Sequence, residues 1–233
     1  MAGVTVLVVQ HKPVEGPYRL GQALVRAGRA LDVRRTYLGD PVPADASSLS
    51  GVVVMGGPMA AYSDEGFASR TAELALLEDA LDRSVPVLGI CLGAQLLAVA
   101  SGGSAVPGHG LEVGWGDVEL TEAAASDELL GSLPTRLRTL HWHGDTVVLP
   151  PQAAHLARSA AYENQAFRVG AAAWGLQPHL ELDRAGVDAF CTEFADEAPG
   201  PLGEEIRERA PEAVAALAGV AEVVFGRFAA LCR

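Results

Sequence analysis

The chain has 233 residues, 49% of them hydrophobic, and is therefore long enough to bury a full globular core. Its 17 basic and 29 acidic residues give a formal net charge of -12 at pH 7, which repels polyanions and argues against a nucleic-acid partner. The one lysine, Lys12, ends no glycine-rich loop, which excludes Walker-type nucleotide hydrolysis.

Three widely spaced cysteines, an odd number, predict free thiols in a reducing cytoplasm. Met1, Ala2 and Gly3 precede a short apolar run and lack the basic segment that opens a signal peptide. Residues 84–111 contain no Asp, Glu, Lys or Arg, but two prolines and six glycines interrupt them, so we expect no membrane span there. The protein is expected to be cytoplasmic, without a membrane partner.

Apolar runs alternate with helical patterns over the first hundred residues. Strands are expected at residues 4–9, 32–37, 51–55 and 85–90, and helices at residues 16–28, 66–83 and 92–100. Asp64 is the candidate N-cap of the second helix. This alternation is typical of parallel β-α-β units. We therefore expect an α/β fold with a doubly wound, mostly parallel sheet flanked by helices.

Beyond residue 116 the pattern changes to short apolar runs that predict a small antiparallel extension, at residues 117–120, 138–142, 146–149, 154–159, 166–169 and 171–177. Residues 181–212 hold ten acidic and three basic residues and are expected to form a solvated helical face. No repeat or linker divides the chain. Residues 1–233 are therefore expected to form one domain with a helical tail from about residue 198.

The tail is expected to be an amphipathic helix with Pro211 in its first turn. Apolar residues then recur at steps of three or four, at Val214, Leu217, Ala221, Val224, Phe228 and Leu231. A terminal helix of this kind usually covers the sheet of its own domain, although the same stripe would also suit a partner interface.

The most informative segment is residues 86–96, which reads as a strand, a turn and a helix. Cys91 stands in the turn with Gly89 and Gly93 two residues away on either side, as a nucleophile on a sharp strand-to-helix turn requires. The helix N-terminus is expected to lower the pKa of the thiol and to offer the N–H of Leu92 to an oxyanion. The alternative is a small buried cysteine in a tight turn.

A thiolate mechanism also needs a base and a group that orients the base. His179 and Glu181 stand two residues apart, on one side of an extended segment, and can act as one unit. Cys191, inside a predicted helix, and Cys232, near the C-terminus, are expected to be inert thiols.

These motifs resemble those of the class I glutamine amidotransferases, in which the nucleophile turn reads G-x-C-x-G-x-Q and a distal motif reads roughly Q-F-H-P-E. Gln177, His179 and Glu181 match the distal motif, whereas Pro178 and Leu180 replace its Phe and Pro. Further similar segments, within a resemblance that spans roughly residues 4–195, lie at residues 54–59, 112–115, 141–145, 149–151 and 164–168. Together they resemble a stand-alone subgroup similar to the amidotransferase domain of guanosine monophosphate synthetase and to plant γ-glutamyl peptidases.

The resemblance implies a flavodoxin-like fold and a triad of Cys91, His179 and Glu181. This triad would cleave the γ-carboxamide of glutamine, or a γ-glutamyl amide, through a thioester and without a cofactor. The resemblance also implies that the amides of Gly57 and Leu92 hold the oxyanion.

Three further residues are implied to bind the substrate. Gln95, one helical turn beyond the nucleophile, would contact the substrate amino acid, and its alternative role is that of a capping or core-edge amide. His143 and Asp145 would line the pocket. Their alternative is a turn in which Asp145 caps the backbone and His143 packs on Trp142.

The run His141-x-His143-x-Asp145 also resembles the metal-binding run of the metallo-β-lactamase fold and would make the chain a zinc hydrolase. Against this alternative, Thr146 stands where that run usually continues into another histidine. The remaining histidines show no ligand spacing, so no metal is expected.

Three function classes stay open: a free-standing γ-glutamyl hydrolase, a glutaminase subunit that feeds ammonia to a separate synthase, and a non-catalytic relative that acts as a binding module. The segment after Glu181 is too short for an ATP-using synthetase. The likeness of residues 141–181 to the stand-alone subgroup favours the free-standing hydrolase.

Overall fold

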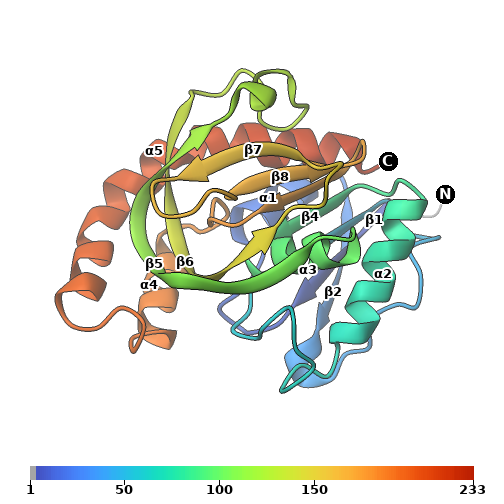
Figure 1. Ribbon diagram of the computed structural model, residues 1–233, viewed down its shortest axis with the longest axis horizontal. Coiled ribbons are helices and arrows are strands. Elements are labelled where there is room, and N and C mark those ends of the chain that lie inside the picture. Colours follow the sequence, from blue (N-terminus) through green and yellow to red (C-terminus); the bar gives the residue numbers. More distant parts are fainter. Residues whose placement is uncertain (1–3) are drawn as a thin grey trace.

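The computed structural model describes residues 4–233, so the expectation for Met1, Ala2 and Gly3 falls outside the described residues (Figure 1). A nine-stranded sheet runs through the molecule in the order β2-β1-β3-β4-β9-β8-β7-β5-β6. Its first five strands are parallel and its remaining pairs are antiparallel. The predicted α/β fold, with a parallel sheet flanked by helices and an antiparallel extension, is confirmed.

The parallel half consists of β1 (Thr5–Gln10), β2 (Ala30–Arg35), β3 (Gly51–Val54), β4 (Val87–Ile90) and β9 (Ala173–Leu176). Its helices are α1 (Tyr18–Arg26), α2 (Arg70–Asp82) and α3 (Leu92–Ala100).

Side chains alternate between the two faces of the sheet along strand β1. Val6 and Val8 enter the core on the α1 side, whereas Leu7 and Val9 enter the core on the α2 and α3 side. Burial on both faces explains why the strands read as continuous apolar runs.

Two local expectations in this half are wrong. The second strand ends at Arg35, and Thr36–Leu38 forms a 3-10 helix. Asp64 does not cap α2, which begins at Arg70, and instead forms an ion pair of 2.8 Å with the guanidinium of Arg70. Buried Phe67 lies between Asp64 and the helix. Its N–H bonds to the carbonyl of Asp64 in a turn, so the helix begins only after this turn, at Arg70.

The antiparallel half consists of β5 (Ser104–Leu120), β6 (Arg136–Val148), β7 (Ala154–Ser159) and β8 (Ala166–Val169), with a 3-10 helix at Glu122–Ser126. It begins earlier than expected, and the two runs predicted at residues 138–142 and 146–149 form one strand, β6. Residues 171–177 are expected within this extension, but β9 also pairs in parallel with β4. Because β9 is antiparallel to β8, the chain direction reverses there and β9 can join the parallel half.

The C-terminal part forms α4 (Arg184–Glu193) and α5 (Pro201–Leu231). Pro201 occupies the first turn of α5, and Pro211 lies inside the helix instead of in the first turn, where it was expected. Ile206 and Ala210 are buried beside α4, and this packing extends the helix upstream despite a proline cost of about 3 kcal/mol. Figure 1 shows α5 bent, as a helix with an internal proline usually is.

The apolar stripe of α5 covers the core beside α1. Val214, Leu217, Ala221, Val224 and Phe228 are buried, and Leu231 is partly buried. By length and composition alone α5 could also cross a membrane, and 39% of its most apolar window is buried. One such helix is weak evidence of a span, because core helices of soluble proteins pass the same test.

We predict that Phe225→Ala, which removes a fully buried ring from α5, lowers the free energy of unfolding by about 3–5 kcal/mol. Val223→Ala, at a position 39% exposed on the same helix, should cost less than about 1 kcal/mol. Urea unfolding of both variants measures the difference. Equal costs would contradict the packing of α5 on the core.

Candidate active site

Cys91 stands between β4 and α3 in a backbone conformation that residues with side chains rarely adopt. Its φ is 51° and its ψ is -107°. A Cβ on Gly89 would lie 2.3 Å from the carbonyl oxygen of Gly93, and a Cβ on Gly93 would lie 2.0 Å from that of Val54. Only glycine fits at either position. The turn therefore fixes the direction of the thiol at the carboxyl edge of the parallel strands.

His179 follows β9 and is held by its backbone and its ring. Its N–H donates to the carbonyl of Leu140 on β6 at 2.8 Å, and its Nδ1 lies 2.7 Å from Oε1 of Glu181. Both side chains are 1% exposed. The ring is also close enough to the thiol of Cys91 for each group to shift the pKa of the other. The structure thus brings the three predicted catalytic residues together.

The protons of this group are tightly coupled. Burial raises the pKa of Cys91, although His179 acts to lower it. The expectation of a lowered thiol pKa is therefore wrong, because burial outweighs the lowering effect of His179. Burial also acts against the charged form of His179, but the charge of Glu181 and the contact with Cys91 raise the pKa of that imidazole well above its usual value. The proton of the thiol thus has a strong acceptor beside it.

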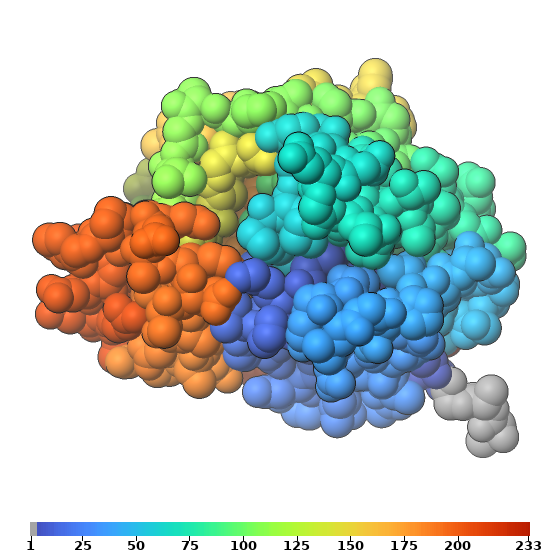
Figure 2. Space-filling view, turned by 90° about the horizontal axis from the view of Figure 1, so that it is seen from below, coloured from blue at the N-terminus to red at the C-terminus, as the bar shows by residue number. Residues whose placement is uncertain are grey.

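A pocket of about 200 Å³ opens in front of the thiol. Figure 2 shows the molecule from below. On this side the blue N-terminal segment lies next to the teal segment and next to the orange segment that contains α4. The residues that line the pocket come from several loops and strands, and they are Gly57, Pro58, Met59, Cys91, Gln95, Leu111, Trp142, His143, Gly144, Asp145 and Glu197.

The two residues predicted to supply the oxyanion donors lie in contact. A Cβ on Gly57 would be 2.8 Å from Cδ2 of Leu92, so the loop after β3 touches the start of α3. Leu92 is the first residue of α3, and its N–H therefore has no acceptor within the helix.

The three predicted substrate-binding residues all line this pocket. Gln95 is buried and donates from Nε2 to Oε1 of Gln177 at 3.3 Å. Asp145 is half-buried. Burial raises the pKa of its carboxyl and outweighs the hydrogen bond from Tyr62, which acts to lower it. Both ring nitrogens of His143 are engaged, Nδ1 by the carbonyl of Asp145 and Nε2 by the carboxylate of Glu112.

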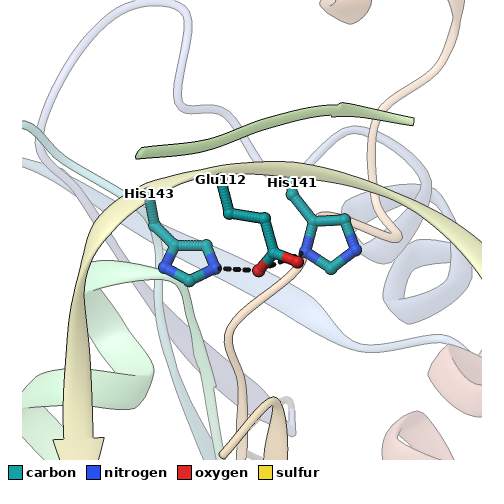
Figure 3. A group of neighbouring side chains, drawn as sticks. All are labelled: Glu112, His141 and His143. Carbon is teal, nitrogen blue, oxygen red and sulfur yellow. Dashed lines mark hydrogen bonds and ion pairs between the residues drawn. The ribbon is translucent and has the colours of Figure 1, made fainter. Parts of the chain in front are cut away.

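The side chains of His141, His143 and Asp145, the alternative zinc set, do not come together as one group of ligands. Among residues 4–233, the group with metal-ligand spacing contains Glu112 in place of Asp145 (Figure 3). Asp145 contributes only its backbone carbonyl to His143. Glu112 was missed as a ligand candidate because it lies on another strand.

Two carboxylates near the thiol, one buried and one half-buried, also escaped the sequence analysis. Oε2 of Glu15 has no hydrogen-bond partner and lies where a Cβ on Gly56 would be 2.2 Å away. Burial raises the pKa of Glu15 to about 7 and outweighs the charge of His179, which acts to lower it. Glu197, in the acidic run that was expected to be solvated, lines the pocket and accepts from Nε1 of Trp142 at 3.0 Å. No sequence motif marks either residue.

A buried ion pair supports the loop that carries Gly57. Nδ1 of His11 lies 2.9 Å from the carbonyl of Gly56, and its Nε2 lies 2.9 Å from Oε2 of Glu73 on α2. Burial opposes protonation, but Glu73 raises the pKa of His11. The pair anchors the loop against α2.

Comparisons with known proteins agree on one family. A family model described as glutamine amidotransferase class-I matches residues 18–188. The chain is 32% identical over 167 residues to the glutamine amidotransferase-like protein YfeJ of Salmonella typhimurium, covering 70% of each. It is 31% identical over 180 residues to one subunit of the glutamine-hydrolysing GMP synthase of Methanoregula boonei, covering 72% of this chain and 90% of that subunit.

The solved structures show the same likeness. A glutamine amidotransferase from Methylobacillus flagellatus superposes with a TM-score of 0.92 at 32% identity, over 100% of this chain and 96% of that one. The chain spans about a third of the length of the GMP synthase of Porphyromonas gingivalis, which it matches at 31% identity over 69% of its own length.

We predict that Glu15→Gln gains stability relative to the wild type as pH rises from about 5 to about 8. A carboxyl whose pKa is raised on folding keeps its proton in the folded state while the unfolded state loses it, so the wild type loses stability between its unfolded and folded pKa values. The relative gain should be about 1–3 kcal/mol by urea unfolding. The exposed control Glu163→Gln should show no such trend. A pH-independent difference for Glu15→Gln would contradict the burial of its charge.

Proposed function

The chain belongs to the class I glutamine amidotransferases, and from this premise we propose that it hydrolyses the γ-carboxamide of glutamine, or a γ-glutamyl amide, through Cys91, His179 and Glu181. The observation that carries the proposal is the contact of one strained thiol with one buried imidazole-carboxylate pair. A nucleophile, a base and a group that orients the base are what a thiol hydrolase needs.

The first half of the reaction forms a thioester. In the resting site the thiol of Cys91 faces the carbonyl of Trp142 at 3.7 Å, and His179 takes its proton as the sulfur attacks the amide carbon. The amides of Gly57 and Leu92 receive the negative charge on the carbonyl oxygen. The C–N bond then breaks, and His179 returns the proton to the departing ammonia or amine.

The second half releases glutamate. A water gives a proton to His179 as its oxygen attacks the thioester, the C–S bond breaks, and the thiol of Cys91 regains the proton. Glu181 holds Nδ1 of the ring throughout, so that Nε2 stays directed at the sulfur. All groups return to their starting protonation.

The size of the pocket favours a small amide. Its volume of about 200 Å³ is below the range of drug-sized sites and suits one amino-acid side chain. Asp145 and Glu197 offer carboxylates for an α-ammonium group, and Gln95 offers an amide. Cys191 and Cys232 are buried, and unlike Cys91 neither lines this pocket. We therefore propose that neither is a nucleophile.

We propose that the chain acts without an obligatory synthase, in the cytoplasm. The apolar stripe of α5 packs on the core of its own chain and so is not free for a partner. The second candidate is a glutaminase subunit, because the chain covers 90% of one GMP synthase subunit. A non-catalytic binding module is the third, and it predicts no turnover of any amide.

We predict that His179→Ala lowers kcat/KM for the amide by about 10³-fold or more, and that Glu181→Ala lowers it by about 10²-fold, because Glu181 orients the base without carrying the proton. Steady-state ammonia release measures both, and circular dichroism checks that each variant folds. His155→Ala, at a partly exposed histidine near the start of β7, is the control and should keep the wild-type rate. Wild-type rates for His179→Ala with loss in His143→Ala would show that the wrong histidine was chosen.

We predict that the purified chain turns over by itself when it is assayed against glutamine and a panel of γ-glutamyl peptides. A subunit that passes ammonia to a synthase should be nearly inactive alone, because its site must be shielded from water until the partner binds. The same assay with added lysate is the comparison. Negligible hydrolysis alone, restored by a protein fraction, would favour the glutaminase-subunit candidate.

A further inference from the structure

One face of the β5–β6 ribbon gathers a carboxylate and two imidazoles. Glu112 pairs directly with His143, and His141 pairs with Gly114, so all three side chains project from the same face. Gly114 and Gly116 have no side chains, and a Cβ on Gly116 would lie 2.8 Å from the ring of His141. Gly116 therefore makes the room that the imidazole fills.

The three side chains converge on one point (Figure 3). Oε2 of Glu112 lies 2.9 Å from Nε2 of His143 and 3.3 Å from Nδ1 of His141, and all candidate ligand atoms lie within 4.8 Å of one another. A tetrahedral ion with bonds of about 2.0–2.1 Å holds its ligand atoms about 3.3 Å apart. Small side-chain rotations bring the three atoms to that spacing.

The hydrogen bonds around this group do not satisfy all three of its candidate ligand atoms. Nδ1 of His143 lies 2.9 Å from the carbonyl of Asp145, which can only accept, so this nitrogen carries the hydrogen. In the neutral ring Nε2 then presents a lone pair, and it faces a carboxylate oxygen. One proton between them would satisfy His143 and Glu112. Nδ1 of His141 lies 3.3 Å from the same carboxylate oxygen, but it is buried and forms no hydrogen bond of good geometry. One cation among the three satisfies all of them.

The surroundings are those of a metal site. The other ring nitrogen of each histidine is engaged, by the carbonyl of Asp145 and by the hydroxyl of Thr139 at 3.2 Å, which fixes both rings. Gln165 donates to Glu112 at 2.6 Å, and its own Oε1 is buried without a partner. Both imidazoles are 1% exposed, whereas the carboxylate is 16% exposed and leaves a path from solvent.

We propose that Glu112, His141 and His143 bind one divalent transition-metal ion of the Zn²⁺ type. Two imidazoles and one carboxylate suit zinc and its neighbours rather than Mg²⁺ or Ca²⁺, which take oxygen ligands. A water, or the oxygen of Gln165 after its amide turns, completes four ligands. This site is distinct from the zinc set considered from sequence, since Asp145 is not a ligand.

The role of the ion follows from the strand that holds it. β6 carries His141 and His143, and its backbone also accepts from His179 at Leu140 and from the thiol of Cys91 at Trp142. The ion contacts none of the reacting atoms. It therefore fixes the strand that supports the thiol and the base, and its action is structural.

The test measures metal binding in a chain that cannot bind metal through its nucleophile. Cys91→Ser removes that thiol, and the proposal does not depend on the proposed hydrolysis. Apo protein is titrated with Zn²⁺ against a chromophoric chelator, and Co²⁺ is used as a spectroscopic probe. We expect one Zn²⁺ per chain, a rise in Tm on binding, and a four-coordinate Co²⁺ spectrum without a thiolate charge-transfer band.

Two ligand variants and one matched control decide the result, all made in the Cys91→Ser background. Glu112→Gln keeps the shape of the side chain and should weaken Zn²⁺ binding by at least about tenfold, and His141→Ala should do the same. His155→Ala, whose imidazole lies beside Glu163 on the surface, should bind as the parent does. Absence of stoichiometric Zn²⁺ binding in the parent, or equal affinity in Glu112→Gln and His155→Ala, would overturn the proposal.

Discussion

The site depends on one strained residue, Cys91, whose left-handed backbone fixes its thiol. A non-glycine residue in such a conformation costs about 1–3 kcal/mol and persists only where its surroundings over-determine it. Gly89 and Gly93 permit the close approach of α3 to β3 and β4, and the parallel pairing of β4 with β3 and β9 holds the strand that precedes the turn. The fold thus supports a geometry that the isolated segment would not keep.

The strand β6 ties the rest of the site to this turn. Its backbone binds both the His179 loop and the thiol, and its opposite partner β5 brings Glu112 to the two histidines. On the other side, the buried pair of His11 and Glu73 anchors the loop that carries Gly57. The antiparallel half therefore supports the proposed catalytic residues from one side.

The sequence predicts best where the determinants are local. The turn at Cys91 needs two glycines between a strand and a helix, and the His179–Glu181 pair needs only two residues at alternate positions, so both could be read directly. The parallel pairing of β9 depends on a reversal elsewhere in the chain, and the internal position of Pro211 depends on packing against α4. Glu15, Glu112 and Glu197 reach their sites only through tertiary contacts, and a lone glutamate carries no signal of such a contact.

The central claim is that Cys91 alone is the nucleophile, and a mechanism-directed label tests it most directly. The purified chain is incubated with a diazoketone analogue of glutamine aimed at the γ-carboxamide site, digested, and examined by peptide mass spectrometry. We predict one adduct per chain, on Cys91, formed much more slowly in His179→Ala. An adduct on Cys191 or Cys232 in place of Cys91, or no adduct while the protein is folded, would contradict the account.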